Sequence, residues 1–202
     1  MLAEAAWAWG FQKASRKAFV ADGAKCNWTL QKRCFAQFVP ILDFIHALSY
    51  VYAAAHAGQT EEKGWACYQE WIQWVWQGQV EKVITALTQR QLELGVPDKT
   101  DGTTSPRRIV AKTLTYLQNH RDKMQYDSYR RDGLPITSSL VESTVKLIGQ
   151  RVKGTEKFWS EDGAEAILQL RADHLSKNQP LDEFWRRRQD SATGFRPHRR
   201  AG

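Results

Sequence analysis

Two short apolar segments separated by one helical stretch constrain the fold of this chain more than any other feature. KAFVADG (17–23) predicts a short buried strand that stops at the Asp22-Gly23 turn. AKCNWTLQKRCFAQ (24–37) has helical periodicity, and FVPILDF (38–44) predicts a second short strand. Another buried helix is predicted from Ile45 to Ala57. This order predicts parallel strands covered by helices, and therefore an α/β fold.

Helices are predicted to dominate the rest of the chain. In EKGWACYQEWIQWVWQGQVEKVITALTQRQLELG (62–95), helical spacing predicts a pair of helices packed through large side chains. Stacking of these aromatic rings on nucleobases is the alternative. VPDKTDGTTSPRR (96–108) predicts a loop, and Ser105-Pro106 predicts the start of the next helix. The residues assigned to the packed face are Trp65, Tyr68, Ile72, Val75 and Trp76.

These patterns divide the chain into four segments. Residues 1–57 are expected to form a partial α/β nucleus, beginning with one amphipathic helix over 2–17. A helical insertion is expected over 58–125, a closing helical segment over 126–190, with a turn-rich lead at YDSYRRDGLP (126–135), and a basic tail over 191–202.

The positive charge of the chain is concentrated in one region. Residues 105–157 carry 11 Lys and Arg against 5 Asp and Glu, whereas residues 1–104 carry 10 of each. Clustered positive charge is typical of a nucleic-acid partner, and a solvated basic face is the alternative. The longest apolar runs are too short for a membrane span, and the first ten residues lack the features of a secretory signal, so we expect a cytoplasmic protein.

Three cysteines, Cys26, Cys34 and Cys67, share no CxxC spacing. We expect them to be reduced thiols. A zinc site that uses Cys26, Cys34, Asp43 and His46 is an alternative, although the ligand spacing is unusual.

Acidic residues follow both predicted strands. Asp22 lies at the end of the first strand, where α/β folds place their sites, although Asp22-Gly23 also fits a simple turn. Asp43 follows the second strand and is well placed to cap the next helix, with His46 three residues later. Asp43 and His46 are therefore predicted either to form a helix cap, with the histidine hydrogen-bonded within the protein, or to brace a polar site.

The segment PITSSLVESTVKLIGQRVKGTEKFW (135–159) offers a third carboxylate. Ser139-x-x-Glu142 fits a capping box, and Lys146 lies one turn after Glu142. Carboxylates from separate segments that converge beside cations could instead hold Mg²⁺ for phosphodiester chemistry. The cations expected to contact DNA are Arg130, Arg131, Lys146, Arg151, Lys153 and Lys157.

Four segments together resemble insertion-sequence transposases of the Kra type, which belong to the DDE superfamily and have an RNase H-like fold. They are FVADGAKCNW, ILDFIHA, YRRDGLPITSSLVESTVKLIGQRVKGTEKFW and EAILQLRADHLS. The resemblance implies metal-dependent DNA cleavage and strand transfer, with Mg²⁺ or Mn²⁺ as cofactor, transposon ends and target DNA as partners, and a homo-oligomer. It also implies that Asp22 and Glu142 are the second and third metal-binding carboxylates, and that Asp43 and His46 form the family's D-x-x-H element.

One departure from the family pattern affects the expected activity. The first carboxylate should lie on an upstream strand, and only Glu4 precedes Asp22 among the acidic residues. We therefore expect the C-terminal portion of a transposase, truncated or remnant, with weak ion binding and no catalysis alone. A non-catalytic basic helical module that binds DNA or a transposase subunit is the alternative.

Overall fold

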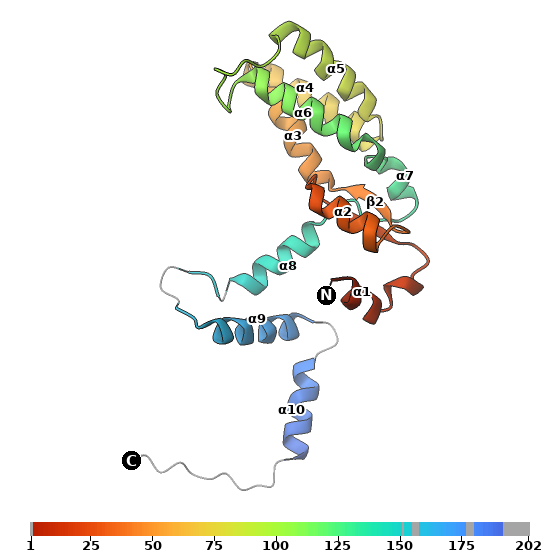
Figure 1. The fold of residues 1–202 in the computed structure, drawn as a ribbon, viewed down its shortest axis with the longest axis vertical. Helices are drawn as coiled ribbons and strands as arrows, with labels where there is room; N and C mark the ends of the chain where they lie inside the picture. Colours follow the sequence, from red (N-terminus) through yellow and green to blue (C-terminus); the bar gives the residue numbers. More distant parts are fainter. Residues whose placement is uncertain (1, 151, 155–157, 177–179, 192–202) are drawn as a thin grey trace. The chain divides into compact units, whose positions relative to one another are not determined.

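The computed structural model describes residues 2–150, 152–154, 158–176 and 180–191. The described chain is dominated by helices and contains two short parallel strands, which agrees with the expected helix-rich α/β class (Figure 1). In chain order, the elements up to the second strand are α1 (Leu2–Ala8), the 3-10 helix η1 (Phe11–Lys13), β1 (Ala18–Ala21), α2 (Lys25–Cys34) and β2 (Val39–Leu42). The later elements are α3 (Phe44–His56), α4 (Glu61–Trp76), α5 (Val80–Leu94), α6 (Pro106–His120), η2 (Arg121–Lys123), α7 (Tyr126–Arg131), α8 (Ser139–Gly149), α9 (Glu161–Leu175) and α10 (Pro180–Asp190).

The two strands confirm the strand–helix–strand prediction. β1 and β2 pair in parallel, with Ala18 opposite Val39 and Ala21 opposite Leu42, and α2 connects them. Ile41 and Leu42 are fully buried, as the apolar run predicts. The parallel pairing brings the carboxyl ends of both strands to the same edge of the sheet.

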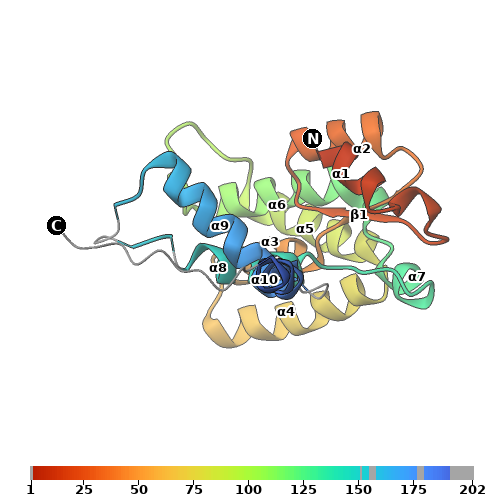
Figure 2. The ribbon, with the colours of Figure 1, turned by 90° about the horizontal axis from the view of Figure 1, so that it is seen from below.

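Four helices form the main hydrophobic core. α3 packs on α4 and α6, and α5 packs on the other sides of α4 and α6, so the helices close into a bundle (Figures 1 and 2). Pro106 is the first residue of α6, as predicted, because its missing N–H is not needed in the first turn. The fully buried apolar residues of this core are Ala47, Val51, Ala54, Ala55, Val75, Val83, Leu87, Val110 and Leu117.

The packed face of α4 differs from the prediction. Val75 is buried and Tyr68 and Ile72 pack against the core as expected, but Trp65 is 51% exposed and Trp76 is 40% exposed. Trp71 is the deeply buried tryptophan of this helix. Every tryptophan fits a helix pattern, so spacing alone could not identify which of them faces α3 and α5.

Two segments differ from their predicted local structure. The expected single helix at the N-terminus is interrupted at Gly10, whose φ of 76° is left-handed, so α1 ends at Ala8. The lead at 126–135, predicted as turns, begins with the short helix α7. Tyr126 of α7 is buried and donates a hydrogen bond to the Leu42 carbonyl (3.0 Å), which connects α7 to the end of β2.

The chain divides into two compact units, residues 1–139 and 140–202, which are described separately. The first unit contains the sheet and the bundle. In the second unit, the Ser160 hydroxyl caps α9 by accepting from the Gly163 N–H (3.2 Å). The expected basic tail is outside the described residues except at Ser191. None of the described helices combines the length and the apolar character that crossing a membrane would require.

Candidate metal-binding site at the carboxyl ends of the strands

Asp22 and Asp43 lie at the same edge of the sheet. Each follows the last residue of its strand, and those residues, Ala21 and Leu42, are paired. The Asp43 N–H also donates to the Ala21 carbonyl (2.8 Å). The sequence predicted both strand ends, and the parallel pairing makes them neighbours.

Asp22 organises the turn into α2 and keeps one oxygen available. Its Oδ1 accepts from the Ala24 N–H (3.0 Å) and from the Asn27 side-chain amide (2.8 Å). Its Oδ2 has no hydrogen bond or ion pair with any residue that the structure describes. The turn interpretation of Asp22-Gly23 is therefore confirmed, and it is compatible with a ligand at Oδ2.

Asp43 is a buried connector between three segments. It is 1% exposed, and its Oδ1 accepts from the His46 N–H (2.8 Å), which caps α3 as predicted. Its Oδ2 accepts from the Ser138 N–H (2.6 Å) and the Ser138 hydroxyl (2.9 Å). Burial alone would raise the pKa of Asp43, but the hydrogen bonds from Ser138 and His46 outweigh burial and lower it. Asp43 is thus held as a carboxylate.

His46 completes this arrangement. Its Nδ1 lies 3.1 Å from Asp43 Oδ1, and because an ionised carboxylate only accepts, Nδ1 carries the hydrogen. The opposite nitrogen, Nε2, has no hydrogen bond with the described part of the chain. The side chain is 44% exposed, so Nε2 can reach a ligand from solvent. The hydrogen bond from the His46 N–H to Asp43 caps α3, and the exposed Nε2 leaves the His46 ring able to face a polar site.

Ser138 connects Asp43 to the start of the helix that carries Glu142. The preceding loop is held beside α3 by a hydrogen bond from the Phe44 N–H to the Ile136 carbonyl (2.9 Å). α8 begins at Ser139, so Ser138 takes the position just before the helix, and Glu142 lies in the first turn. The predicted capping box placed Ser139 in that position, one residue later. Glu142 itself belongs to the second unit.

Two residues of α6 near this edge were missed in the sequence. A side chain at Gly23 would collide with the Tyr116 ring and meet His120 Nε2 at 3.0 Å, so both rings lie against the Asp22-Gly23 turn. Burial, with Tyr50 and the charges of Asp22 and Asp43, raises the pKa of Tyr116, which keeps its hydroxyl protonated. Their spacing of one helical turn within RRIVAKTLTYLQNH was the available signal, but it does not show which segment they face.

The predicted DNA-contacting cations fall into different surroundings. The Arg130 guanidinium lies 3.7 Å from the centre of the Trp76 ring and donates to the Trp76 carbonyl (3.0 Å). Arg131 forms an ion pair with Asp127 (2.9 Å). Lys146 on α8 and Lys153 after it are exposed. Arg151 and Lys157 lie outside the described residues.

The cysteines are free thiols, as predicted. Within the described ranges, no cysteine belongs to a group of three or more His, Cys, Asp or Glu side chains that could hold a metal. The zinc alternative therefore has no support from the structure.

We expect His120 to make the stability of the protein depend on pH. Burial and the nearby Lys123 charge lower the pKa of His120, and its buried Nδ1 has no hydrogen-bond partner among the described residues. The unfolded chain therefore binds a proton more readily than the folded protein, and stability decreases as the pH falls below about 6.5. His120→Gln should reduce this slope, by at most about 1.4 kcal/mol per pH unit. Urea denaturation from pH 5 to 8 measures it, and equal slopes would contradict the prediction.

Comparisons with known proteins return no match for this chain, whether against family models, curated proteins or solved structures.

Proposed function

We propose that this chain is the C-terminal portion of the catalytic domain of a DDE transposase with an RNase H-like fold, acting on DNA in transposition. The observation that carries the proposal is the pair of hydrogen bonds from Ser138 to Asp43. They hold the start of the Glu142 helix at the sheet edge where Asp22 also lies. Asp22 and Asp43 thus share one edge of the sheet, and the chain runs from Ser138 directly into the helix that carries Glu142.

The chain itself limits how far Glu142 can be from this edge. Three residues separate Ser138 from Glu142, and they are helical. Because a helix rises about 1.5 Å per residue, the two Cα atoms are about 6 Å apart along the axis. Glu142 is therefore covalently tethered to a residue that is bonded to Asp43. We propose that Asp22 and Glu142 provide the ion-binding oxygens.

The residues fit a divalent cation. Asp22 has an oxygen without a partner in the described chain, and carboxylates are the ligands that Mg²⁺ and Mn²⁺ prefer. Asp43, His46 and Glu142 form a group of two carboxylates and an imidazole that could also hold an ion. Asp43 already accepts four hydrogen bonds, so we assign it and His46 to bracing the site. A bound ion would activate water and stabilise the leaving oxygen of a phosphodiester.

The family pattern requires one more carboxylate on an earlier strand. Within the described residues, the chain before β1 forms α1 and η1. We therefore propose that ion binding by this chain is weak and that it does not cut DNA alone. DNA cleavage by the purified chain with Mg²⁺ or Mn²⁺, abolished by Asp22→Ala, would overturn this part of the proposal.

A non-catalytic basic module is the second candidate function. The four hydrogen bonds that Asp43 accepts favour this function. They account for the buried carboxylate without any bound ion. In that case Glu142 stabilises the start of α8, and the chain holds DNA or a transposase subunit through its cations.

Divalent-ion binding separates the two functions. Under the transposase proposal, Glu142→Gln and Asp22→Asn each weaken Mn²⁺ binding by tenfold or more, measured by electron paramagnetic resonance of free Mn²⁺, since each removes a ligand charge. Glu161→Gln, an exposed glutamate in the first turn of α9, is the control and should leave binding unchanged. Under the basic-module function, Mn²⁺ does not bind, and Glu142→Gln instead changes the free energy of unfolding by about 0.5–2 kcal/mol.

A further inference from the structure

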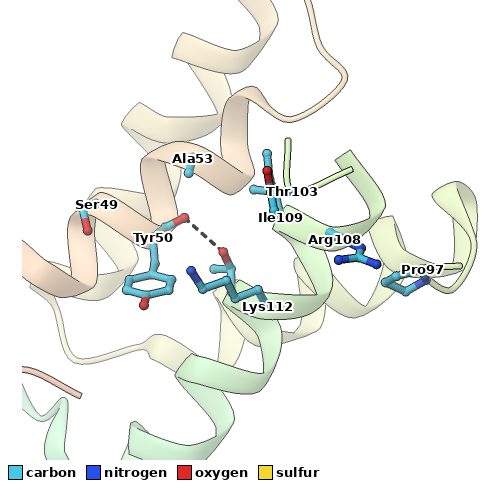
Figure 3. A pocket seen from close by; sticks show the side chains of 9 residues that line it. Ser49, Tyr50, Ala53, Pro97, Thr103, Arg108, Ile109 and Lys112 are labelled. Atoms are coloured by element: carbon cyan, nitrogen blue, oxygen red, sulfur yellow. Dashed lines mark hydrogen bonds between the residues drawn. The ribbon is translucent and has the colours of Figure 1, made fainter. Parts of the chain in front are cut away.

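A groove runs along α6 from the loop before it to the Asp22-Gly23 turn. It consists of two adjoining hollows of about 550 and 800 Å³ that share Tyr50 and Lys112. The first is formed between α3, α6 and the loop that contains Pro97 (Figure 3). The second is lined by Gly23, Lys25 and the C-terminal half of α6. We call the two hollows together the α6 groove.

The charge of the α6 groove is positive. Arg108 and Lys112 lie one turn apart on α6, about 6 Å along its axis, and Lys25 lies in the second hollow. Among the described residues, no Asp or Glu side chain lines either hollow, and none of these three cations forms an ion pair. The Arg108 guanidinium makes only long hydrogen bonds, of 3.3 and 3.4 Å, to backbone carbonyls of the preceding loop. Hydrogen bonds from Asp98 and Ser105, with the charges of Arg107 and Arg108, lower the pKa of Asp101, so Arg108 already has an acidic neighbour. Lys112 and Lys25 are the cations open to an anionic ligand.

Three aromatic side chains line the groove, Tyr50, Tyr116 and His120, and each of their rings contacts another protein group. The Tyr50 ring stacks on Tyr116 with a centroid distance of 3.8 Å and an interplanar angle of 7°. The Lys112 ammonium lies 5.3 Å from the Tyr50 centroid, beside the ring in Figure 3. A nucleobase would have to displace one of these contacts to stack there. The groove is therefore suited to anionic groups and not to bases.

We propose that the α6 groove binds the sugar–phosphate backbone of one DNA strand and leads it to Asp22. Lys112 and Arg108 contact successive parts of the backbone, and Lys25 contacts it beside the Asp22-Gly23 turn. The choice of DNA as the polyanion rests on the proposed function. The geometry adds the path of the strand. It also adds the mode of recognition, through charge and not through base stacking, because the ring of Tyr50 already contacts Tyr116 and Lys112.

The proposed course of the DNA strand along the α6 groove can be tested separately from catalysis by measuring oligonucleotide binding in the absence of divalent ions. The probe is a fluorescein-labelled 20-nucleotide single strand, measured by fluorescence anisotropy with the full chain in EDTA. Lys112→Glu should weaken binding tenfold or more, and Arg108→Ala about threefold or more. Lys112→Ala should also make the plot of log affinity against log salt less steep by about 0.7, the value for one lost contact to a single strand.

A matched lysine controls for net charge. Lys63 is exposed on α4 and lines neither hollow, so Lys63→Glu makes the same charge change elsewhere and should weaken binding less than threefold. An oligonucleotide of the same sequence with an uncharged backbone should bind more than tenfold more weakly. Any of three results would overturn the inference. The first is an equal loss of binding for Lys112→Glu and Lys63→Glu, the second is an unchanged salt dependence for Lys112→Ala, and the third is that the unmodified chain does not bind the oligonucleotide. Mn²⁺ binding, measured as above, is unaffected by Lys112→Ala, so failure of the groove and failure of the proposed function are distinguishable.

Discussion

Replacing Asp43 with alanine is expected to lower the free energy of unfolding by about 2–4 kcal/mol. The substitution removes the cap of α3 and both hydrogen bonds that Ser138 donates to Asp43. Loss of a helix cap costs about 1 kcal/mol, and loss of the two hydrogen bonds from the half-buried Ser138 to a charged acceptor costs about 1–3 kcal/mol more. Urea denaturation at pH 7 measures the loss, and a shift of the midpoint with an unchanged slope would show that the folded state alone is affected.

Two comparisons identify the source of this loss. Asp43→Asn keeps an acceptor at one oxygen and should lose about half as much. Asp22→Ala removes the one oxygen that accepts two hydrogen bonds in a more exposed turn and should cost about 1 kcal/mol. The pKa of Asp43 is lowered in the folded state, so its contribution is complete above the ordinary value of 3.8 and is lost as the pH falls through the folded value. If Asp43→Ala and Asp22→Ala were equally stable, the connecting role of Asp43 would be wrong.

The local parts of the fold were predictable because they depend on neighbouring residues. Apolar runs that end in Asp-Gly and Asp-Phe identified both strands, and the Ser105-Pro106 pair identified the first residue of α6. Burial periodicity and turn chemistry act over fewer than ten residues, which is the range that a single sequence reports. The placement of Asp22 and Asp43 at one sheet edge followed from those elements.

The contacts that define the candidate site could not be predicted in the same way. Ser138 and Asp43 are 95 residues apart, and Tyr126 bonds to a strand 84 residues earlier. Contacts between residues so far apart in the sequence form only because the helical bundle brings α7 and the loop after it back beside the sheet. The periodicity of apolar residues does not predict such contacts. For the same reason, the helical pattern of α4 did not distinguish the buried Trp71 from the exposed Trp65.

The question of whether Glu142 is a cap or a ligand changes once Ser138 is placed. The residue before α8 is Ser138, and its hydroxyl and N–H are both directed to Asp43. The start of this helix is thus fixed by a buried carboxylate of the sheet edge. Ser138, one residue before the predicted cap, is therefore the residue whose contacts fix where α8 begins.

Arg90→Ala is expected to destabilise the protein by about 2–4 kcal/mol. Arg90 is 8% exposed, and its guanidinium donates to the carbonyls of Ala55 (3.1 Å) and Ala57 at the end of α3. These carbonyls have no partner in the following turn of a helix, so Arg90 on α5 satisfies them and joins the two helices. Its loss leaves both acceptors buried and removes the packing of the long side chain.

Thermal and urea denaturation of Arg90→Ala and Arg90→Lys test this role. Lysine keeps the charge but presents one ammonium, which cannot match the fork of a guanidinium that spans two carbonyls. We therefore expect Arg90→Lys to recover less than half of the lost stability. Arg107→Ala is the matched control, because Arg107 is exposed and donates to a single carbonyl, that of Leu94 (2.6 Å). A loss for Arg90→Ala no larger than that for Arg107→Ala would show that water replaces the guanidinium at the end of α3, and the two helices would then be held by apolar packing alone.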